Sequence, residues 1–511
     1  MQAVTAEWKA TNQRFLLPET FVEISCRVPD VAYSISSVSA LNEETFSATD
    51  LVATEGTAAI PHYATMEQNL WVLDGSRGIL PDLTPNLTPG YVSGYYTEPY
   101  IGGSVTVKLP NVMQSSFPGI TVVWSNEFGE YPTSFYVDVQ NGSTVIASTV
   151  VTNNRESKVL VDLEMSGFDS VTVTPTDWCL PERRIRLEKI VLGHDITFNK
   201  GDLVSYQHEH TGDILCGELP KNMIQFSVLN VDGRWNPSNP TGLWRYLSDR
   251  QKITARYGLD VNGTIEWVPA GVFYLSDWNA PANGLEATFE ARDIFEYLLN
   301  QPYSGEATGA MSELVTSAIG GLVSDVTFTP EMETLVGTLT SERKAAEVVQ
   351  MCANASCSSV YQNRAGGLNF KKWDTYAVSD YVVGAALSYA HPEITLSKPM
   401  RGIAVTYAPE TPAFELTLGT NGEVQTLENE LIGTIEQAVL VADWTRIVLE
   451  SRQTITGEFR ADPRLDLYDI VTVESKYGAI LPVVITNIAY SYSGSFKASY
   501  SGRVIGLGVS R

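Results

Sequence analysis

The sequence is poor in the residues and segments on which several classes of protein depend. Its 511 residues include five histidines and five cysteines, and 34 lysines and arginines stand against 59 aspartates and glutamates. No run of about 18 apolar residues occurs, so we expect no membrane-spanning helix. The opening residues, MQAVTAEWKATNQRF, lack the apolar segment and cleavage site of a signal peptide. These shortages predict a protein that is made in a cytoplasm and remains soluble there.

The few potential metal ligands form no recognisable set. An odd number of cysteines favours buried, reduced thiols over a disulfide framework. Cys352 and Cys357 have no second cysteine or histidine pair nearby, so we expect them to pack in a core. His208 and His210 share one face of a predicted strand, but a third ligand is missing and a solvated surface position is the simpler interpretation. We predict no metal site.

The charge and the motifs also argue against two large functional classes. The net charge is −25, and acidic residues are spread over the whole chain, which disfavours binding to nucleic acid. There is no GxSxG, HExxH or P-loop sequence, and no cysteine or histidine stands in a recognisable nucleophile context. We therefore predict no catalytic residues, no cofactor and no enzymatic activity.

The stretch from 217 to 300 has the densest structural signals. Ile224, Phe226 and Val228 alternate with polar residues, which is the period-two pattern of a strand with one buried face. Ile253, Ala255 and Tyr257 repeat this pattern. The Asn-Gly pairs at 262–263 and 283–284 suit hairpin turns, because these residues tolerate positive φ angles. Two successive hairpins and a helix over 293–299 are predicted.

The residue pattern is different on either side of this stretch. Residues 91–195 contain seven or more short alternating runs separated by turn residues, which is typical of a β-sandwich. Helical periodicity over 311–319 and 342–355, with short strands between, predicts a small α/β part at 303–400. Beyond it we expect a strand at 403–407, a hairpin at Asn421-Gly422 and a helix over 434–450.

Several segments together resemble one family. GELPKN, FSVLNVDGRWNPSNPTGLWRYL, ITARYGL and FEARDIFEYL, with YATMEQNLWVLDGS at 63–76 and GEFRADPRLDLYDIVTV at 457–473, are similar to central tail hub proteins of phages and prophages of Gram-positive bacteria. No single one of these motifs is diagnostic. The resemblance implies a baseplate-hub-like fold with two tube-type β-barrels per chain, which form a homotrimer around the tail channel.

With this resemblance the expected fold is mainly β with a smaller α/β part, two tube-type β-barrels and an inserted β-sandwich. The expected domains are the N-terminal strands of the first hub barrel with a linker (1–90), the inserted sandwich (91–195), the remainder of the first barrel (196–302), the small α/β domain (303–400) and the second barrel with one helix (401–511). In the second barrel the expected first strand is 403–407. The resemblance places Asp462-Pro463 and Asp469 at the start of a barrel strand.

The expected function follows from the resemblance. It implies a structural protein at the distal tail tip or baseplate of a virion, synthesised in the host cytoplasm, that guides DNA ejection and contacts the distal tail ring, the tape measure and the tip or fibre proteins. DNA would pass through the channel without sequence-specific binding. If the chain lines the channel, an acidic wall would let DNA pass without adhering.

The sandwich at 91–195 resembles galactose-binding-like jelly rolls that phages insert into tail proteins. The resemblance implies a carbohydrate-binding module for host attachment, in which aromatic rings stack on sugars. Our candidates are Trp124, Tyr131 and Trp178, although an aromatic residue in a sandwich is more commonly part of the core.

Two other functions stay open. A distal tail ring protein also accepts sugar-binding inserts but usually has one tube barrel, so the number of barrels discriminates. A secreted glycan-binding protein or glycosidase would need a signal peptide or anchor.

Overall fold

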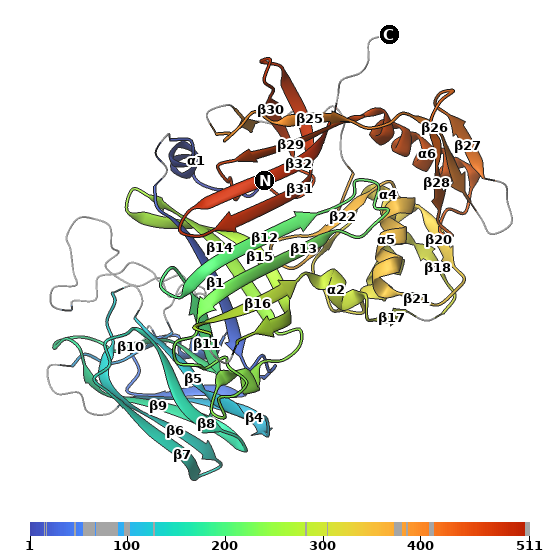
Figure 1. Ribbon diagram of the computed structural model, residues 1–511. Helices are drawn as coiled ribbons and strands as arrows, with labels where there is room; N and C mark the ends of the chain where they lie inside the picture. The colour runs from blue at the N-terminus through green and yellow to red at the C-terminus, as the bar shows by residue number, and fades with distance from the viewer. Residues whose placement is uncertain are drawn as a thin grey trace. The chain divides into compact units, whose positions relative to one another are not determined.

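The computed structural model describes the chain except for a set of short stretches, and it divides into two compact units (Figure 1). The residues left undescribed are 15, 17, 45–46, 55–66, 68–89, 97–102, 126–127, 282–283, 304, 373–380, 385–386, 408–412 and 506–511. The first unit consists of Met1–Ser25, Thr197–Asn239 and Lys252–Arg511, and the second of Cys26–Ile196 and Pro240–Gln251. Of the two segments that carried the resemblance outside 217–300, residues 457–473 are all described, whereas only Glu67 of residues 63–76 is.

The first unit is built on one long sheet, although the end of β1 and the start of β11 are counted with the second unit. The strands of this sheet follow the order β11-β1-β14-β15-β16-β13-β12-β31-β32-β29-β25, while β30 pairs with β31 and β24 pairs with β30. These strands are β1 (Thr20–Val28), β11 (His194–Phe198), β12 (Leu203–Thr211), β13 (Lys221–Leu229), β14 (Lys252–Val261), β15 (Thr264–Asn279), β16 (Glu286–Arg292), β24 (Val382–Val383), β25 (Glu393–Leu396), β29 (Gln453–Phe459), β30 (Ile470–Glu474), β31 (Ile480–Tyr492) and β32 (Phe496–Val504). The expected mainly β class with a smaller α/β part is confirmed.

The local patterns explain these strands. Ile224, Phe226 and Val228 of β13 are buried on one face, as the alternation predicts. The predicted hairpin between β14 and β15 is present, and its turn residues Asn262 and Gly263 both have positive φ angles. The second predicted turn falls partly on Asn283, which is outside the described residues, and it connects β15 to β16.

A short helix near the N-terminus packs on the same unit. Helix α1 (Ala6–Asn12) begins after Thr5, whose hydroxyl accepts a hydrogen bond from the Trp8 backbone N–H. The buried indole of Trp8 packs against Leu259 and Val268 of the first hairpin. The segment is thereby fixed on β14 and β15.

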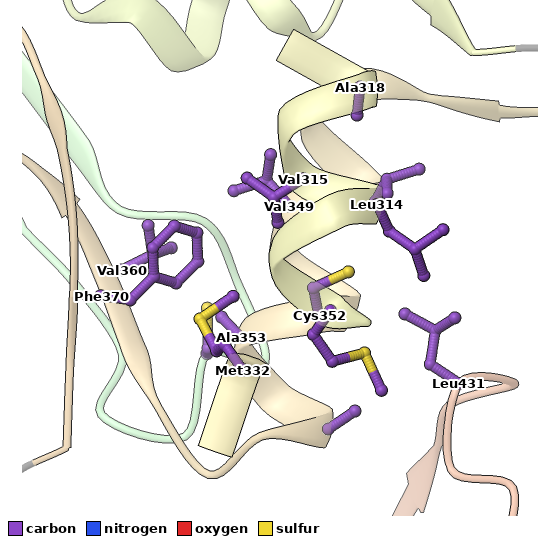
Figure 2. Packing of buried hydrophobic residues seen from close by; sticks show 14 of the residues in the cluster. Leu314, Val315, Ala318, Met332, Val349, Cys352, Ala353, Val360, Phe370 and Leu431 are labelled. Atoms are coloured by element: carbon purple, nitrogen blue, oxygen red, sulfur yellow. The ribbon is translucent and has the colours of Figure 1, made fainter. Parts of the chain in front are cut away.

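The α/β part of this unit has its own core, shown in Figure 2. Helix α3 contributes Leu314 and Val315, and helix α5 packs beside it with Val349 and Cys352, so this cysteine lies in a core as expected. The elements are α2 (Ile294–Leu298), β17 (Pro302–Tyr303), β18 (Ala307–Ala310), α3 (Met311–Ile319), β19 (Val326–Thr327), α4 (Pro330–Thr334), β20 (Val336–Leu339), β21 (Arg343–Lys344), α5 (Ala345–Ala355), β22 (Ser359–Gln362), β23 (Leu368–Lys371), β26 (Met400–Thr406), β27 (Phe414–Thr417), β28 (Glu423–Glu428) and α6 (Ile435–Glu450).

Two expectations for the C-terminal part were wrong. Strand β26 does not begin the second barrel, because it forms a separate three-stranded sheet with β27 and β28 and its Ile403 and Val405 pack in the core of the α/β part. The Asn421-Gly422 turn does not close a hairpin, since β27 and β28 lie on opposite sides of β26. Two bulky apolar side chains fit either environment, so their pattern alone did not decide which sheet they enter.

The second unit is a β-sandwich. A five-stranded sheet with the order β2-β4-β9-β6-β7 and a four-stranded sheet with the order β3-β10-β5-β8 share one hydrophobic core. The elements are β2 (Ser37–Leu41), η1 (Thr49–Ala53), β3 (Tyr91–Val92), β4 (Ser104–Met113), β5 (Phe117–Trp124), β6 (Pro132–Asn141), β7 (Thr144–Thr152), β8 (Lys158–Met165), β9 (Phe168–Trp178), β10 (Arg186–Leu192) and η2 (Leu243–Tyr246). The sandwich thus also takes in β2, which precedes residue 91. No helix among the described residues is long and apolar enough to cross a membrane.

Candidate functional sites for assembly and for glycan binding

The long sheet contains the same arrangement of five strands twice. We call β14-β15-β16-β13-β12 the first strand module and β30-β31-β32-β29-β25 the second strand module, since each lists its strands in spatial order. The order of the strands along the chain also matches: β12, β13, β14, β15 and β16 of the first module correspond to β25, β29, β30, β31 and β32 of the second. Both central hairpins carry a bulge at the matching place, between Leu275 and Asp277 in β15 and between Ile485 and Asn487 in β31. Sequence reasoning missed this repeat.

The two modules meet through a pairing that we call the joint, in which β12 lies antiparallel to β31. Six residue pairs form it, from Tyr206 opposite Tyr492 to Thr211 opposite Asn487. Strand β31 is long enough to pair with β30 through its first half and with β12 through its second half. The chain therefore contains one complete example of how two such modules join.

A buried polar cluster lies on the inner face of the joint. The His208 ring accepts a hydrogen bond from the Tyr257 hydroxyl at Nδ1 and donates one from Nε2 to Asn222 Oδ1 at 2.6 Å. This assignment requires a neutral ring, and burial lowers the pKa of His208 to about 4. Burial, together with the neighbouring His208, lowers the pKa of His210 to about 3. The two rings stack at a centroid distance of 6.4 Å.

The expected surface position of His208 and His210 was therefore wrong. Both side chains are buried, because β12 is covered by strands of both modules instead of lying at a solvated edge. No group of three or more histidine, cysteine, aspartate or glutamate side chains that could hold a metal occurs among the residues that the structure describes.

Arg364 connects the two modules from the α/β part. Its Nε donates to Asp466 Oδ1 at 2.6 Å, and its Nη1 donates to the carbonyl oxygens of Pro269 and Pro463, each at 2.6 Å. Nη2 donates to the Leu465 carbonyl at 2.8 Å. Pro269 belongs to β15 of the first module, whereas the other partners lie in the loop before β30. Although burial alone would raise it, Arg364 and the other donors around Asp466 hold the pKa of this carboxyl below its usual range.

The same loop holds the aspartates that the resemblance singled out. Asp462 accepts two hydrogen bonds from the buried Arg464 guanidinium, and its backbone carbonyl accepts one from the Tyr490 hydroxyl. Asp469 directly precedes β30 and receives the N-terminal ammonium of Met1 at 2.6 Å. These residues fix the start of β30.

The face of the joined modules opposite the buried cluster is polar. In β12, β13, β31 and β32 its side chains are mainly serine, threonine, asparagine and glutamine. The carboxylates on this face are Glu209, Asp260, Asp277, Glu286, Glu290, Glu393, Glu458 and Glu474, and the cations with exposed or partly exposed side chains are Lys221, Lys252, Arg256, Arg292 and Lys497. Arg503 bonds instead to backbone carbonyls at the end of α6. Arg256 pairs with Glu23, and Arg292 pairs with Glu290 and Glu296. Carboxylates therefore outnumber the cations on this face.

The candidate sugar-binding residues are brought together at one end of the sandwich. Trp124 is fully buried and packs edge to face against Phe135 and Trp178, so its indole belongs to the core and offers no face to a ligand. Tyr131 and Trp178 are partly buried. The Trp178 indole donates to Glu130 Oε2 at 3.1 Å, and Glu130 also pairs with Arg183 at 2.8 Å. Glu130 and Arg183, which sequence reasoning did not single out, thus hold the Trp178 ring in place.

The chain matches no family model and no curated protein. It is similar to solved structures of tail proteins, including the following three. The 43 kDa tail protein of prophage MuSo2 from Shewanella oneidensis is 12% identical with a TM-score of 0.43, over 60% of this chain and 94% of that one. The tail protein from Neisseria meningitidis MC58 is 10% identical with a TM-score of 0.44, over 61% and 94%. The prophage tail protein gp18 from Listeria monocytogenes EGD-e is 10% identical with a TM-score of 0.39, over 60% and 91%. Because these scores are low, the function below rests on the chain's own geometry and sequence.

Proposed function

We propose that this chain is a structural protein of a phage tail tip or baseplate, namely the central hub, in which three copies form a ring around the tail channel. The observation that carries the proposal is the pair of strand modules joined side by side in one sheet with a polar outer face. In this proposal the sheet is a segment of a tube wall, which modules of further copies would complete. The resemblance of the sequence to hub proteins supports the same assignment.

The polar face of the modules is the proposed channel wall. Its excess of carboxylates over lysines and arginines supports a surface along which DNA moves during ejection without adhering, because affinity for DNA comes chiefly from lysine and arginine. The partners of the ring would be the distal tail ring, the tape measure and the tip or fibre proteins. The presence of two modules in one chain favours the hub over a distal tail ring protein, which usually has one barrel.

The sandwich is proposed as a module that binds host-surface carbohydrate. Support comes from the end of the sandwich where Trp178 and Tyr131 lie close together and carry polar neighbours, which is the combination that sugar sites use. In this proposal the chain itself performs no reaction, and Trp124 has a structural role.

Light scattering and electron microscopy test the hub proposal. We expect the purified chain to have the mass of three copies and its class averages to show a threefold ring with a central hole. Labelled antibody against the chain should bind the distal end of tails. A sixfold ring would indicate a distal tail ring protein, and a monomer that cleaves polysaccharide would overturn the proposal.

A further inference from the structure

Among the strand edges of the first unit that have no partner in the described residues, two stand at matching places of the strand modules. One is the outer edge of β25, whose inner edge pairs with β29. The other is the last part of β15, from Leu275 to Asn279, on the side away from β16, because β14 begins at Lys252 opposite Tyr274 and extends no further. Unpaired edges expose backbone donors and acceptors that a further strand can satisfy.

The repeat shows that these two edges are complementary. When the modules are superposed through their pairings and bulges, β25 takes the place of β12, and the last part of β15 takes the place of the half of β31 that pairs with β12. Within the chain, the β12 edge and this half of β31 form the joint. Each chain thus has one joint closed and the two halves of a second joint open.

We propose that β25 of one copy pairs antiparallel with the end of β15 of a second copy, in the register of the joint. The proposal names the contact that closes the ring of the proposed function, on which it rests. It makes the ring head to tail, because each copy offers β25 on one side and β15 on the other.

The register follows from the pairs already present. Thr395 of β25 corresponds to Glu209 of β12, because their pairing partners in β29 and β13 hold matching places. Asn279 of β15 corresponds to Ala489 of β31, because their pairing partners in β16 and β32 hold matching places. Since Glu209 lies opposite Ala489 in the joint, Thr395 should lie opposite Asn279 of the neighbour. By the same correspondence Leu396 lies opposite Trp278.

The side chains of β25 fit such burial. Ile394 and Leu396 occupy the positions of His208 and His210, which the joint leaves only 4% and 7% exposed. In a single copy Ile394 is 40% and Leu396 is 64% exposed. Two large apolar side chains of β25 are therefore exposed, whereas the corresponding side chains of β12 are buried by the joint. Their expected partners, Ala280 and Trp278, are apolar too.

The backbone hydrogen bonds of the proposed pairing between β25 and β15 can also form. The Gly212 N–H donates to the Thr486 carbonyl, so the directly opposed pairs of the joint alternate from there, and Glu209 opposite Ala489 is a non-hydrogen-bonded pair. By correspondence Pro281 would face Glu393 in a pair of the same kind, where the N–H that proline lacks is not required. Thr395 and Asn279 would also form such a pair, whose side chains are close enough for an engineered disulfide.

A cysteine pair tests the register in the full-length chain. In a Cys179→Ser background, where the four remaining cysteines are buried, we expect Thr395→Cys with Asn279→Cys to give covalent oligomers that end at a closed trimer on oxidation. Each single variant should stay uncrosslinked. Thr395→Cys with Asp277→Cys, which is shifted by two residues, should crosslink far less.

A second variant tests the apolar contact without a covalent crosslink. Leu396→Lys should abolish the trimer seen by light scattering, whereas Leu41→Lys in the second unit, at a leucine that is 65% exposed, should leave it intact. Equal effects of the two variants, or a trimer whose Thr395 and Asn279 positions do not crosslink, would overturn the proposed contact while leaving the hub assignment standing. Crosslinked trimers that are absent from tails would instead refute the hub assignment and keep the contact. A chain that stays monomeric and uncrosslinked at its highest soluble concentration would refute the contact.

Discussion

Replacing Arg364 by alanine should lower the free energy of unfolding of the first unit by about 3–5 kcal/mol, the cost of leaving one partner of a buried ion pair uncompensated. The Arg364 side chain is 9% exposed and that of Asp466 is 14% exposed, so water replaces the guanidinium poorly. The substitution also removes the donors to three backbone carbonyls, which belong to both strand modules.

A second donor to Asp466 reduces the expected loss of unfolding free energy. Asp466 keeps a hydrogen bond from Gln2 Nε2 at 2.7 Å after the substitution, and this donor compensates part of the remaining charge. We therefore expect the lower part of the range for the carboxylate itself, to which the lost carbonyl bonds add. Asp466→Asn in the Arg364→Ala background should recover part of the loss, because it removes the unpaired charge.

Urea unfolding followed by fluorescence measures the change. Arg446→Ala is the matched control, since Arg446 makes its ion pairs, with Asp443 and Glu450, on the exposed face of α6, where the expected cost is about 0–1 kcal/mol. If Arg364→Ala cost no more than Arg446→Ala, the view that Arg364 fastens the two modules together would be refuted.

Two further predictions concern the joint and the sandwich. Burial lowers the pKa of His208 to about 4, so between pH 6.5 and 4 the unfolded chain binds more protons than the folded chain, and stability falls as the pH falls. His208→Gln should reduce this loss of unfolding free energy by up to about 3 kcal/mol between pH 6.5 and 4. Urea unfolding at several pH values measures the difference. Asp293, whose pKa burial raises to about 7, contributes with the opposite sign in both proteins, so an unchanged slope in the variant would contradict the account of His208. On a glycan array, Tyr131→Ala should weaken binding of the full chain at least tenfold, while Tyr136→Ala on the outer face of β6 should not; equal binding by all three proteins would remove Tyr131 from the site.

The sequence predicted elements whose pattern is local. The alternation in β13, the Asn-Gly turn after β14 and the helical period of α3 are each specified within about ten residues, and the structure has all three. The repeat of the modules could not be seen in this way, because matched positions hold unlike residues, such as His208 and Ile394 or Phe226 and Gly457. What the modules share is backbone pairing, which depends on contacts between distant segments.

The histidines show the same limit at the level of one side chain. A histidine on an alternating strand is usually exposed, and only the arrival of β31 beside β12 makes His208 a buried residue. Likewise Trp124 and Trp178 are indistinguishable as aromatic residues near strand ends, whereas the structure places one in the core and the other at its margin.

The joint has a consequence for how the protein is made. Strand β12 leaves the ribosome long before β31, with the whole α/β part between them, so its edge stays unpaired during most of translation. In the proposed ring, that edge would be accepted by a neighbouring copy. A chain terminated before residue 487 would thus present a competent but incomplete edge, and only a finished chain hides it. If the proposed ring forms, closing the joint within the chain before any contact with another copy would restrict assembly to full-length molecules.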